Sequence, residues 1–240
     1  MGMKIGLMGA MDEEIVQILE VLQNQESSVI AGIRFVQGSW YGHEVVVCKS
    51  GVGKVNAAVA TQLLIDRFEV EQIWFTGVAG AVHPDLVVGD IVISSSCQQH
   101  DMDVAPLGYT RGVTPYQAVS DFPADPALIA LAQGACQRQC TDHKHVLGRI
   151  LSGDQFIANP GYVKTVLYQQ LGGACVEMEG AALAQVCQMN AIPYIVLRSI
   201  SDQADGEAEV NFAEFTVMAA ARSFAIVKDM MQHVIMDNPA

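Results

Sequence analysis

Short apolar segments alternate with helix-like segments along almost the whole of this 240-residue chain. Repeated strand–helix units of this kind build a sheet whose two faces are both covered by helices. We therefore expect an α/β fold, in which a mixed central sheet is flanked by helices on both faces. The predicted strands span residues 4–8, 33–37, 44–48, 72–76, 90–95, 145–152 and 193–200. The predicted helices span residues 12–22, 53–68, 126–138, 160–170, 179–189 and 212–236.

The pattern predicts a single domain over residues 1–240, because no low-complexity tract, internal repeat or linker-like block interrupts it. Met1-Gly2, ahead of a second methionine, is interpreted as a remnant of cloning. The string "GSWYGHEVV" at residues 38–46 predicts a hairpin turn between adjacent strands. In the helix predicted over residues 53–68, a mostly apolar face recurs at the helical spacing. Its members are Val55, Ala58, Val59, Gln62 and Leu63.

The amino-acid composition narrows the classes of function that this chain could have. A hydrophobic fraction of 51% indicates a large core, and a net charge of −13 argues against a nucleic-acid partner. No apolar run approaches the roughly 18–20 residues that span a bilayer, so no membrane association is expected. The apolar N-terminal stretch runs directly into Asp12, Glu13 and Glu14, which is typical of a first core strand and not of a signal peptide.

The six cysteines are scattered, mostly within apolar runs, as expected for reduced thiols in a cytoplasmic protein. One string, "CQRQCTDHKH", places Cys136, Cys140, His143 and His145 within ten residues. Zinc sites usually combine two close pairs that are separated by a long gap. Side chains at a solvent-facing helix end are therefore the preferred interpretation, and no metal site is expected.

Five predicted strand ends carry polar or glycine-rich strings, and in α/β sheets ligands bind beyond the carboxyl ends of the strands. The strings are "GAMDEE", "TGVAGAV", "SGDQFIANP", "VEMEG" and "RSISDQAD". Carboxylates that converge on one pocket allow acid–base chemistry, metal binding or hydrogen bonds to sugar hydroxyls, and the residues alone leave these alternatives open. The acids at these ends are Glu13, Glu14, Asp154, Glu177, Glu179 and Asp202.

Glu177 and Glu179 lie in "CVEMEGAALAQVC", residues 175–187, which consists almost entirely of small and apolar side chains. A buried carboxylate without partners is costly, so its charge must be satisfied or its proton retained. If residues 176–179 are extended, the two side chains point to the same side. Glu179 also stands where the following helix is predicted to begin, and the helix dipole favours an anion there.

Three familiar sequence motifs, for phosphate binding, for dinucleotide binding and for a serine nucleophile, are incomplete or absent. The string "KSGVGKVNAA" lacks the first glycine of a P-loop, because Cys48 stands there, and Val55 replaces the serine or threonine that holds magnesium. Asn56 replaces the third glycine of a dinucleotide fingerprint, and no G-x-S-x-G nucleophile string occurs. His100 in "QHDMDV" is the most plausible functional histidine, although a hydrogen-bonded structural role fits it better.

Eight strings, in this order, resemble the bacterial 5′-methylthioadenosine/S-adenosylhomocysteine nucleosidases of the purine nucleoside phosphorylase superfamily. They are "GAMDEE", "SGVGKVNAA", "TGVAGAV", "VGDIVIS", "HDMDV", "SGDQFI", "VEMEGAALAQVC" and "RSISDQAD". The resemblance covers roughly residues 3 to 235. It implies an enzyme that hydrolyses the N-glycosidic bond of 5′-methylthioadenosine and S-adenosylhomocysteine, releasing adenine and the free thioribose. No cofactor and no metal is implied.

The resemblance also implies roles for residues at matching positions. Glu14 falls on the general base that activates water, and Asp202 falls on the acid that protonates adenine N7. Met178 and Glu179 fall on the ribose-binding pair, with Glu177 behind them. The other residues implied to form the substrate pocket are Met11, Val78, Gly80, Phe156, Ile157, Arg198, Ser201 and Phe212.

Several of these roles are specific. Phe156 is implied to stack on adenine, Ile157 to read the purine edge through its backbone, and Phe212 to form a lid. Arg198 is implied to lie near the ribose-binding Glu179, while Gly80 ends a glycine-rich turn and Ser201 orients Asp202.

Members of the family are homodimers with the pocket near the subunit interface, which implies the same assembly for this chain. The segment at residues 100–115 is expected to reach the partner subunit, where Val104, Leu107 and Pro115 would complete its pocket. Two positions depart from the family pattern. Val78 stands where a serine is common, and Leu107 stands where an aromatic residue is common.

Phosphorylases of the same fold bind a phosphate dianion, which calls for arginines near the first glycine loop and at the end of the strand entering "TGVAG". Those places hold residues 11–14 and 74–76, where no arginine occurs, so water is the favoured nucleophile. The alternatives are phosphorolysis, hydrolysis of another purine nucleoside such as futalosine, or a catalytically silent nucleoside-binding protein. The sequence does not rank methylthioadenosine, S-adenosylhomocysteine and 5′-deoxyadenosine as substrates.

Overall fold

A computed structural model describes residues 2–204 and 208–234, and Met1 lies outside these ranges. Within them, ten strands form one mixed sheet in the order β10-β6-β8-β9-β5-β1-β4-β3-β2, with β7 paired to β6. The strands are β1 Lys4–Gly9, β2 Gln23–Ile30, β3 Ile33–Trp40, β4 His43–Lys49, β5 Gln72–Ala81, β6 Ile91–Gln99, β7 Asp121–Pro123, β8 His145–Ser152, β9 Gly173–Glu177 and β10 Tyr194–Asp202.

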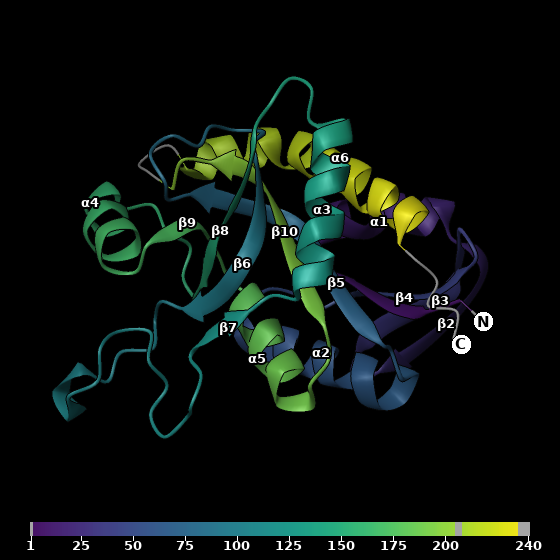
Figure 1. Ribbon diagram of the computed structural model, residues 1–240, viewed down its shortest axis with the longest axis horizontal. Coiled ribbons are helices and arrows are strands. Elements are labelled where there is room, and N and C mark those ends of the chain that lie inside the picture. The colour runs from purple at the N-terminus through teal and green to yellow at the C-terminus, as the bar shows by residue number, and fades with distance from the viewer. Residues whose placement is uncertain (1, 205–207, 235–240) are drawn as a thin grey trace.

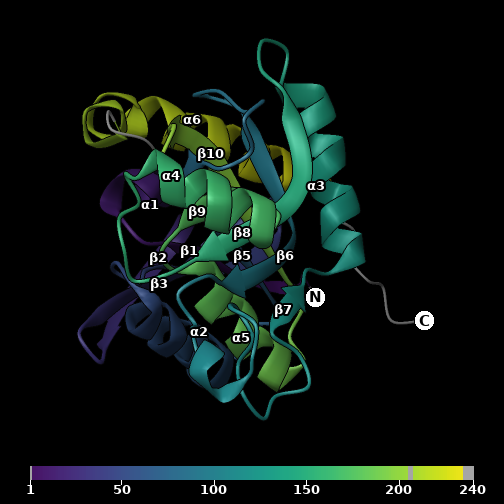
Figure 2. The same ribbon diagram turned by 90° about the vertical axis from the view of Figure 1, so that its left-hand side faces the viewer.

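The helices are α1 Asp12–Val21, α2 Lys54–Phe68, η1 Ala105–Leu107, α3 Pro126–Gln139, α4 Pro160–Tyr162, η2 Val163–Gln170, α5 Gly180–Asn190 and α6 Ala208–His233. They cover both faces of the sheet (Figure 1, Figure 2). Helices α1, α3 and α6 lie on one side, and α2 and α5 lie on the other. The predicted α/β class is confirmed. Within the described ranges, no helix is long and apolar enough to cross a membrane.

Strand β5 pairs with three other strands, β1, β10 and β9. Through these pairings β5, β10, β6, β8 and β9 close into a small barrel. The sequence predicts that this strand ends at residue 76 and that Gly80 ends a glycine-rich turn. Both predictions are wrong. The strand continues to Ala81, and every residue in it is buried. Its glycines serve close packing of neighbouring side chains and not a change of chain direction.

Other predictions have mixed outcomes. The hairpin is confirmed, because Tyr41 and Gly42 form a tight turn between β3 and β4 with φ of 51° and 85°. The helix predicted over residues 160–170 is confirmed as α4, followed without a break by η2, a wider helix of the π type. Strand β2 was not predicted, because its sequence QNQESSVI is exposed almost throughout and carries no apolar pattern.

Helix α2 turns a different face to the core from the one that its periodicity predicts. Val55 and Val59 are 75% and 40% exposed. Alanines allow α2 to pack closely on the sheet and on α5, whereas periodicity ranks the larger valines above them. The buried residues of α2 are Ala57, Ala60, Thr61, Leu64 and Phe68.

Candidate active site

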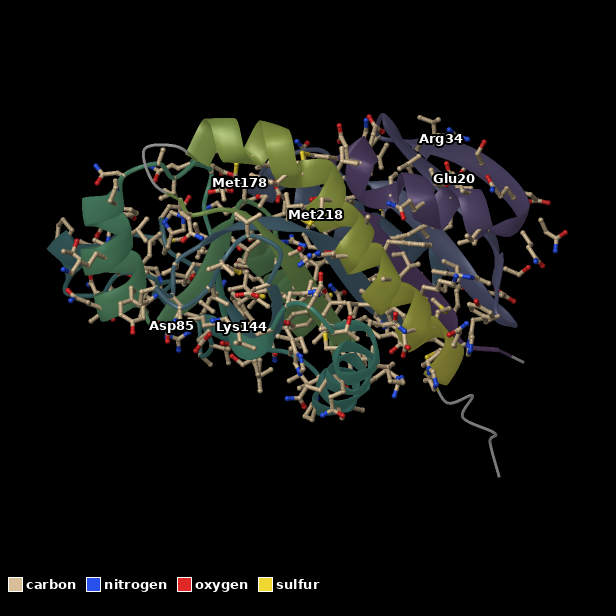
Figure 3. The ribbon with its side chains drawn as sticks, turned by 90° about the horizontal axis from the view of Figure 1, so that it is seen from above. Glu20, Arg34, Asp85, Lys144, Met178 and Met218 are labelled. Atoms are coloured by element: carbon tan, nitrogen blue, oxygen red, sulfur yellow. The ribbon has the colours of Figure 1, made fainter. Side chains whose placement is uncertain are left out.

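A cavity of about 270 Å³ lies beyond the carboxyl ends of β1, β8, β9 and β10, beside the second half of β5. Every pocket residue that the sequence predicts within one subunit lines it except Arg198. Seen from above, Met178 lies near the amino-terminal half of α6 (Figure 3). The lining residues are Ala10, Met11, Glu14, Val52, Val78, Ala79, Gly80, Gln155, Phe156, Ile157, Val176, Glu177, Met178, Glu179, Ser201, Asp202 and Phe212.

Glu14 is held rigidly in the first turn of α1. Its Oε2 accepts from the backbone N–H groups of Ala10 at 2.6 Å and Met11 at 3.0 Å, and its Oε1 accepts from Val78 at 3.0 Å. The side chain is buried, and this burial raises the pKa of Glu14 above its usual 4.5, although nearby Arg198 and the backbone donors partly oppose the shift. The result is a fixed carboxylate whose basicity is greater than that of an exposed glutamate.

Asp202 ends β10 at a bulge. The pairing with β5 shifts register between Ile200 and Asp202, and consecutive residues Ser201 and Asp202 both line the cavity. Asp202 Oδ2 accepts from Ser201 Oγ at 2.9 Å, and Oδ1 accepts from the N–H of Ala204 at 2.8 Å. A Cβ at Gly80 would lie 2.8 Å from Asp202 Oδ1, so the glycine makes room for this carboxylate.

Arg198 is placed differently from the prediction. It is buried and does not line the cavity, and its Nη2 donates to Glu177 Oε2 at 2.5 Å. Its guanidinium carbon lies 4.0 Å from the centre of the Phe75 ring. Its hydrogen-bonded carboxylate partner is Glu177, and Glu179 is also near enough for the two charges to interact.

Glu179 precedes the first residue of α5, as predicted, but the carboxylate that caps this helix is that of Glu177. Its carboxylate accepts from the N–H groups of Gly180 at 2.8 and 2.9 Å and of Glu179 at 3.2 Å, and also from the hydroxyl of Ser152. These donors and Arg198 satisfy the buried charge. The condition that residues 176–179 are extended is not met, because β9 ends at Glu177.

Glu179 is buried near two other acids, Glu177 and Glu14, and faces the cavity. Its Oε1 accepts from the backbone N–H of Gly53 at 2.7 Å. Gly53 has a φ of 98°, which favours glycine. Burial and the neighbouring Glu177 raise the pKa of Glu179 to about 8. The glycines of "SGVGK" thus have a use that the sequence did not reveal, since one of them fixes a pocket carboxylate.

Two aromatic side chains stand together at the cavity. Phe156 is half-exposed, and its ring meets that of Phe212 edge-on, with centroids 5.8 Å apart. Val52 and Gln155 also line the cavity and were not predicted. The one available signal for Val52 was its place as a lone apolar residue between two glycines ahead of a helix.

The described lining residues include no arginine, lysine or histidine. Of the acids at the predicted strand ends, Glu13 and Asp154 are exposed and do not line the cavity. In the part of the chain that the structure describes, no group of three or more His, Cys, Asp and Glu side chains is arranged to hold a metal ion. That search includes the residues of "CQRQCTDHKH".

The segment that is predicted to reach a partner subunit projects away from the body of the molecule (Figure 1). It contains η1 and carries Val104, Leu107 and Pro115, none of which lines the cavity. Leu107 is 69% exposed. Contribution of these residues to a partner's pocket stays a prediction.

Comparison with known proteins identifies the family. A family model described as "Phosphorylase superfamily" matches residues 4–232. A 5′-methylthioadenosine/S-adenosylhomocysteine nucleosidase of Shewanella piezotolerans is 43% identical over 225 residues, which cover 94% of this chain and 97% of that protein. The chain belongs to the 5′-methylthioadenosine/S-adenosylhomocysteine nucleosidase family.

Solved structures of similar proteins agree with this nucleosidase fold. The 5′-methylthioadenosine/S-adenosylhomocysteine nucleosidase of Colwellia psychrerythraea, in complex with adenine, is 39% identical with a TM-score of 0.91, covering 96% of this chain and 95% of that one. A futalosine hydrolase of Helicobacter pylori is 35% identical with a TM-score of 0.91, covering 97% of this chain and 98% of that one.

One departure from the nucleosidase pattern has a limited structural consequence. Val78 lines the cavity, but its contact with Glu14 is made by the backbone N–H. A change of side chain at this position therefore leaves that hydrogen bond in place.

The substitution Glu179→Gln is expected to stabilise the protein at alkaline pH. Because the pKa of Glu179 is about 8 in the folded protein and its usual value is 4.5, the wild type loses stability as pH rises between these values. Glutamine keeps an acceptor for Gly53 and does not titrate. The variant's free energy of unfolding minus that of wild type should increase by on the order of 3 kcal/mol from about pH 5 to about pH 8.5. Urea denaturation at both pH values measures this difference. An equal difference at both pH values would contradict the raised pKa.

Proposed function

We propose that this protein hydrolyses the N-glycosidic bond of 5′-methylthioadenosine and S-adenosylhomocysteine, releasing adenine and the free thioribose. The observation that carries the proposal is the pair of buried carboxylates, Glu14 and Asp202, which line one mainly apolar cavity from different elements. A binding protein needs no such pair, whereas hydrolysis needs both a base and an acid.

Asp202 is the proposed acid. Adenine is a poor leaving group until N7 is protonated, so a carboxyl group must deliver a proton as the C1′–N9 bond breaks. The contacts with Ser201 and Ala204 hold the Asp202 carboxyl in one orientation. The aromatic rings of Phe156 and Phe212 offer the apolar surfaces on which a purine would lie.

Glu14 is the proposed base. In ionised form it accepts a proton from water, which then attacks C1′ of the ribosyl cation. Its backbone donors leave it little freedom, so the water would be presented from a defined direction. Because the pKa of Glu14 is raised, the rate should fall as pH drops through a value above its usual 4.5.

Glu179 and Met178 form the proposed ribose side. Glu179 would hydrogen-bond the ribose hydroxyls, and in its ionised form its negative charge would stabilise the oxocarbenium character that develops on the sugar. Glu177 and Arg198 lie behind it. Their ion pair caps α5 and so supports the turn that carries Met178 and Glu179.

Water is the proposed nucleophile because the described lining of the cavity holds no cation that could bind a phosphate dianion. The nearby Arg198 is engaged by Glu177.

The deciding experiment measures adenine release from 5′-methylthioadenosine without phosphate and then with phosphate in excess. We expect free methylthioribose at an unchanged rate in both conditions. A strict phosphate requirement with a sugar 1-phosphate product would establish a phosphorylase, and binding without release would establish a silent nucleoside-binding protein.

Futalosine hydrolysis is the second candidate, on account of the similar Helicobacter pylori structure. Both reactions need an acid for the leaving purine, and the two substrates differ in the purine and in the group on the 5′ side. Parallel kcat/KM measurements on futalosine and methylthioadenosine decide between them, and we expect methylthioadenosine to be preferred.

We further propose a single domain that assembles as a homodimer in the cytoplasm. Helices α2 and α5 expose apolar side chains, among them Val55 and Met189, at 75% and 74%, and Leu107 is exposed on the projecting segment. Such surfaces are typical of protein interfaces. All six cysteines are unpaired, which fits a reducing compartment. Sedimentation that shows a monomer at micromolar concentration would refute the dimer.

The substitution Gly77→Ala is expected to lower kcat by about a hundredfold. A Cβ at this position would lie 2.4 Å from Glu14 Oε1 and 2.9 Å from its Cδ, so the proposed base must move. Gly134→Ala is the matched control, because its Cβ would meet only the flexible side chain of Arg138, at 3.4 Å. Steady-state kinetics on both variants test the prediction. Normal turnover in Gly77→Ala would show that the position of Glu14 is not critical.

A further inference from the structure

A closed ring of hydrogen bonds outside the cavity joins three distant segments of the chain. Lys54 Nζ donates to Asp101 Oδ1 at 2.8 Å, and the backbone N–H of Asp154 donates to Asp101 Oδ2 at 3.0 Å. The ring is completed by Asp154 Oδ1, which accepts from the backbone N–H of Lys54 at 2.8 Å. None of these three residues lines the cavity.

Two members of the ring are covalently next to residues that form or hold different parts of the cavity wall. Lys54 directly follows Gly53, whose N–H holds Glu179. Asp154 directly precedes residues 155–157, all of which line the cavity. The ring therefore determines how far the amino terminus of α2 lies from the segment that carries the aromatic side of the cavity.

The ring is more firmly held than an ordinary surface ion pair. The side chains of Lys54 and Asp101 are only 20% and 18% exposed, and Lys54 Nζ also donates to Gln99 Oε1 at 2.9 Å. Burial alone would raise the pKa of Asp101, but hydrogen bonds from Lys54 and from the Asp154 backbone outweigh it and hold the pKa below its usual range. The carboxylate is thus charged at neutral pH, and its two oxygens have separate, directional partners.

Close packing at Gly153 adds to the constraint. A Cβ on Gly153 would lie 2.4 Å from His100 Nε2 and 3.0 Å from Asp101 Cγ. The chain before Asp154 therefore passes directly against the end of β6, with no room for a side chain or for sliding of one segment along the other.

We propose that Lys54, Asp101 and Asp154 are positioning residues that set the separation between Glu179 and the segment at residues 155–157. This inference rests on the proposed function, which assigns these two parts of the cavity to ribose and to purine. The three residues act through Gly53 and through the backbone after Asp154. Loss of the ring is therefore expected to weaken substrate binding more than the chemical step, because the contacts that hold the proposed acid and base do not include the ring.

The test breaks the ring at two different bonds. Lys54→Met removes the side-chain cation, and Asp154→Ala removes the acceptor for the Lys54 N–H. Each is expected to raise KM for methylthioadenosine by about tenfold while kcat changes by less than about threefold. Lys54→Arg keeps the cation, and Asp154→Asn keeps an acceptor oxygen, so both should stay within about twofold of wild type.

The matched control is Lys4→Met. It removes a lysine that pairs with Glu44 at 3.4 Å, at the start of β1 and so at the far end of that strand from the cavity. Its KM should equal that of wild type. Melting temperatures identify any variant that does not fold, in which case the other ring-breaking variant decides.

An unchanged KM in the folded ring-breaking variants overturns the inference. So does an equal rise in Lys4→Met or in the conservative variants, because a general loss of charge or stability would then explain it. Failure of the proposed function gives a different result, since wild type would then release no adenine. Adenine binding measured by calorimetry would still test the ring, with weaker binding expected in Asp154→Ala and unchanged affinity overturning it.

Discussion

Glu14→Gln is expected to lower kcat for methylthioadenosine by about a thousandfold. The carboxylate accepts three backbone hydrogen bonds and faces the cavity, so an amide there removes the base while it keeps the size of the side chain. The amide also has to turn an N–H group toward a backbone donor, so a modest loss of stability is expected as well. Steady-state kinetics with a melting curve separate the two effects.

The matched control for this substitution is Glu13→Gln. Glu13 is the neighbouring carboxylate, and it is exposed and outside the cavity. Its turnover should stay within about twofold of wild type. The pH profile gives a second readout, because the acidic limb of the wild-type profile should be missing from the residual activity of Glu14→Gln. Retention of both full turnover and the acidic limb would remove Glu14 from the mechanism.

Asp202→Asn is expected to lower kcat by a similar factor, about a thousandfold, with little change in KM. Asparagine has the shape of aspartate, can accept from the Ala204 N–H and can donate to Ser201 Oγ, so the bulge at the end of β10 should persist. What it lacks is a proton to give to the leaving purine. The measurement is adenine release under saturating substrate.

A substrate with a better leaving group distinguishes a lost acid from a distorted site. In p-nitrophenyl methylthioriboside the leaving group is p-nitrophenolate, which departs without being protonated. Asp202→Asn should therefore cleave this substrate nearly as fast as wild type. Asp85→Asn serves as control, since Asp85 is exposed and lies away from the cavity. Equal loss on both substrates would mean that Asp202 shapes the site and does not supply a proton.

The fold class could be predicted from the sequence because short apolar segments alternate with helix-like segments along most of the chain. Strands that are polar along their length, such as β2, could not be predicted, because pairing with a neighbouring strand, and not burial, holds them in the sheet. The full length of β5 could not be predicted for a different reason. Its glycines resemble a turn, and only the closure of five strands into a barrel explains why they lie within a strand.

The candidate site divides in the same way. The sequence by itself determined which acids stand at strand ends, and its eight ordered strings were enough to identify the family and the proposed roles of Glu14 and Asp202. Only the tertiary structure decided the partners of the other charges. Arg198 pairs with Glu177, and Glu179 takes its hydrogen bond from Gly53, which is 126 residues away along the chain. Such pairings depend on which strand ends lie side by side and on the backbone angle of a single glycine, and a local pattern of residues contains neither.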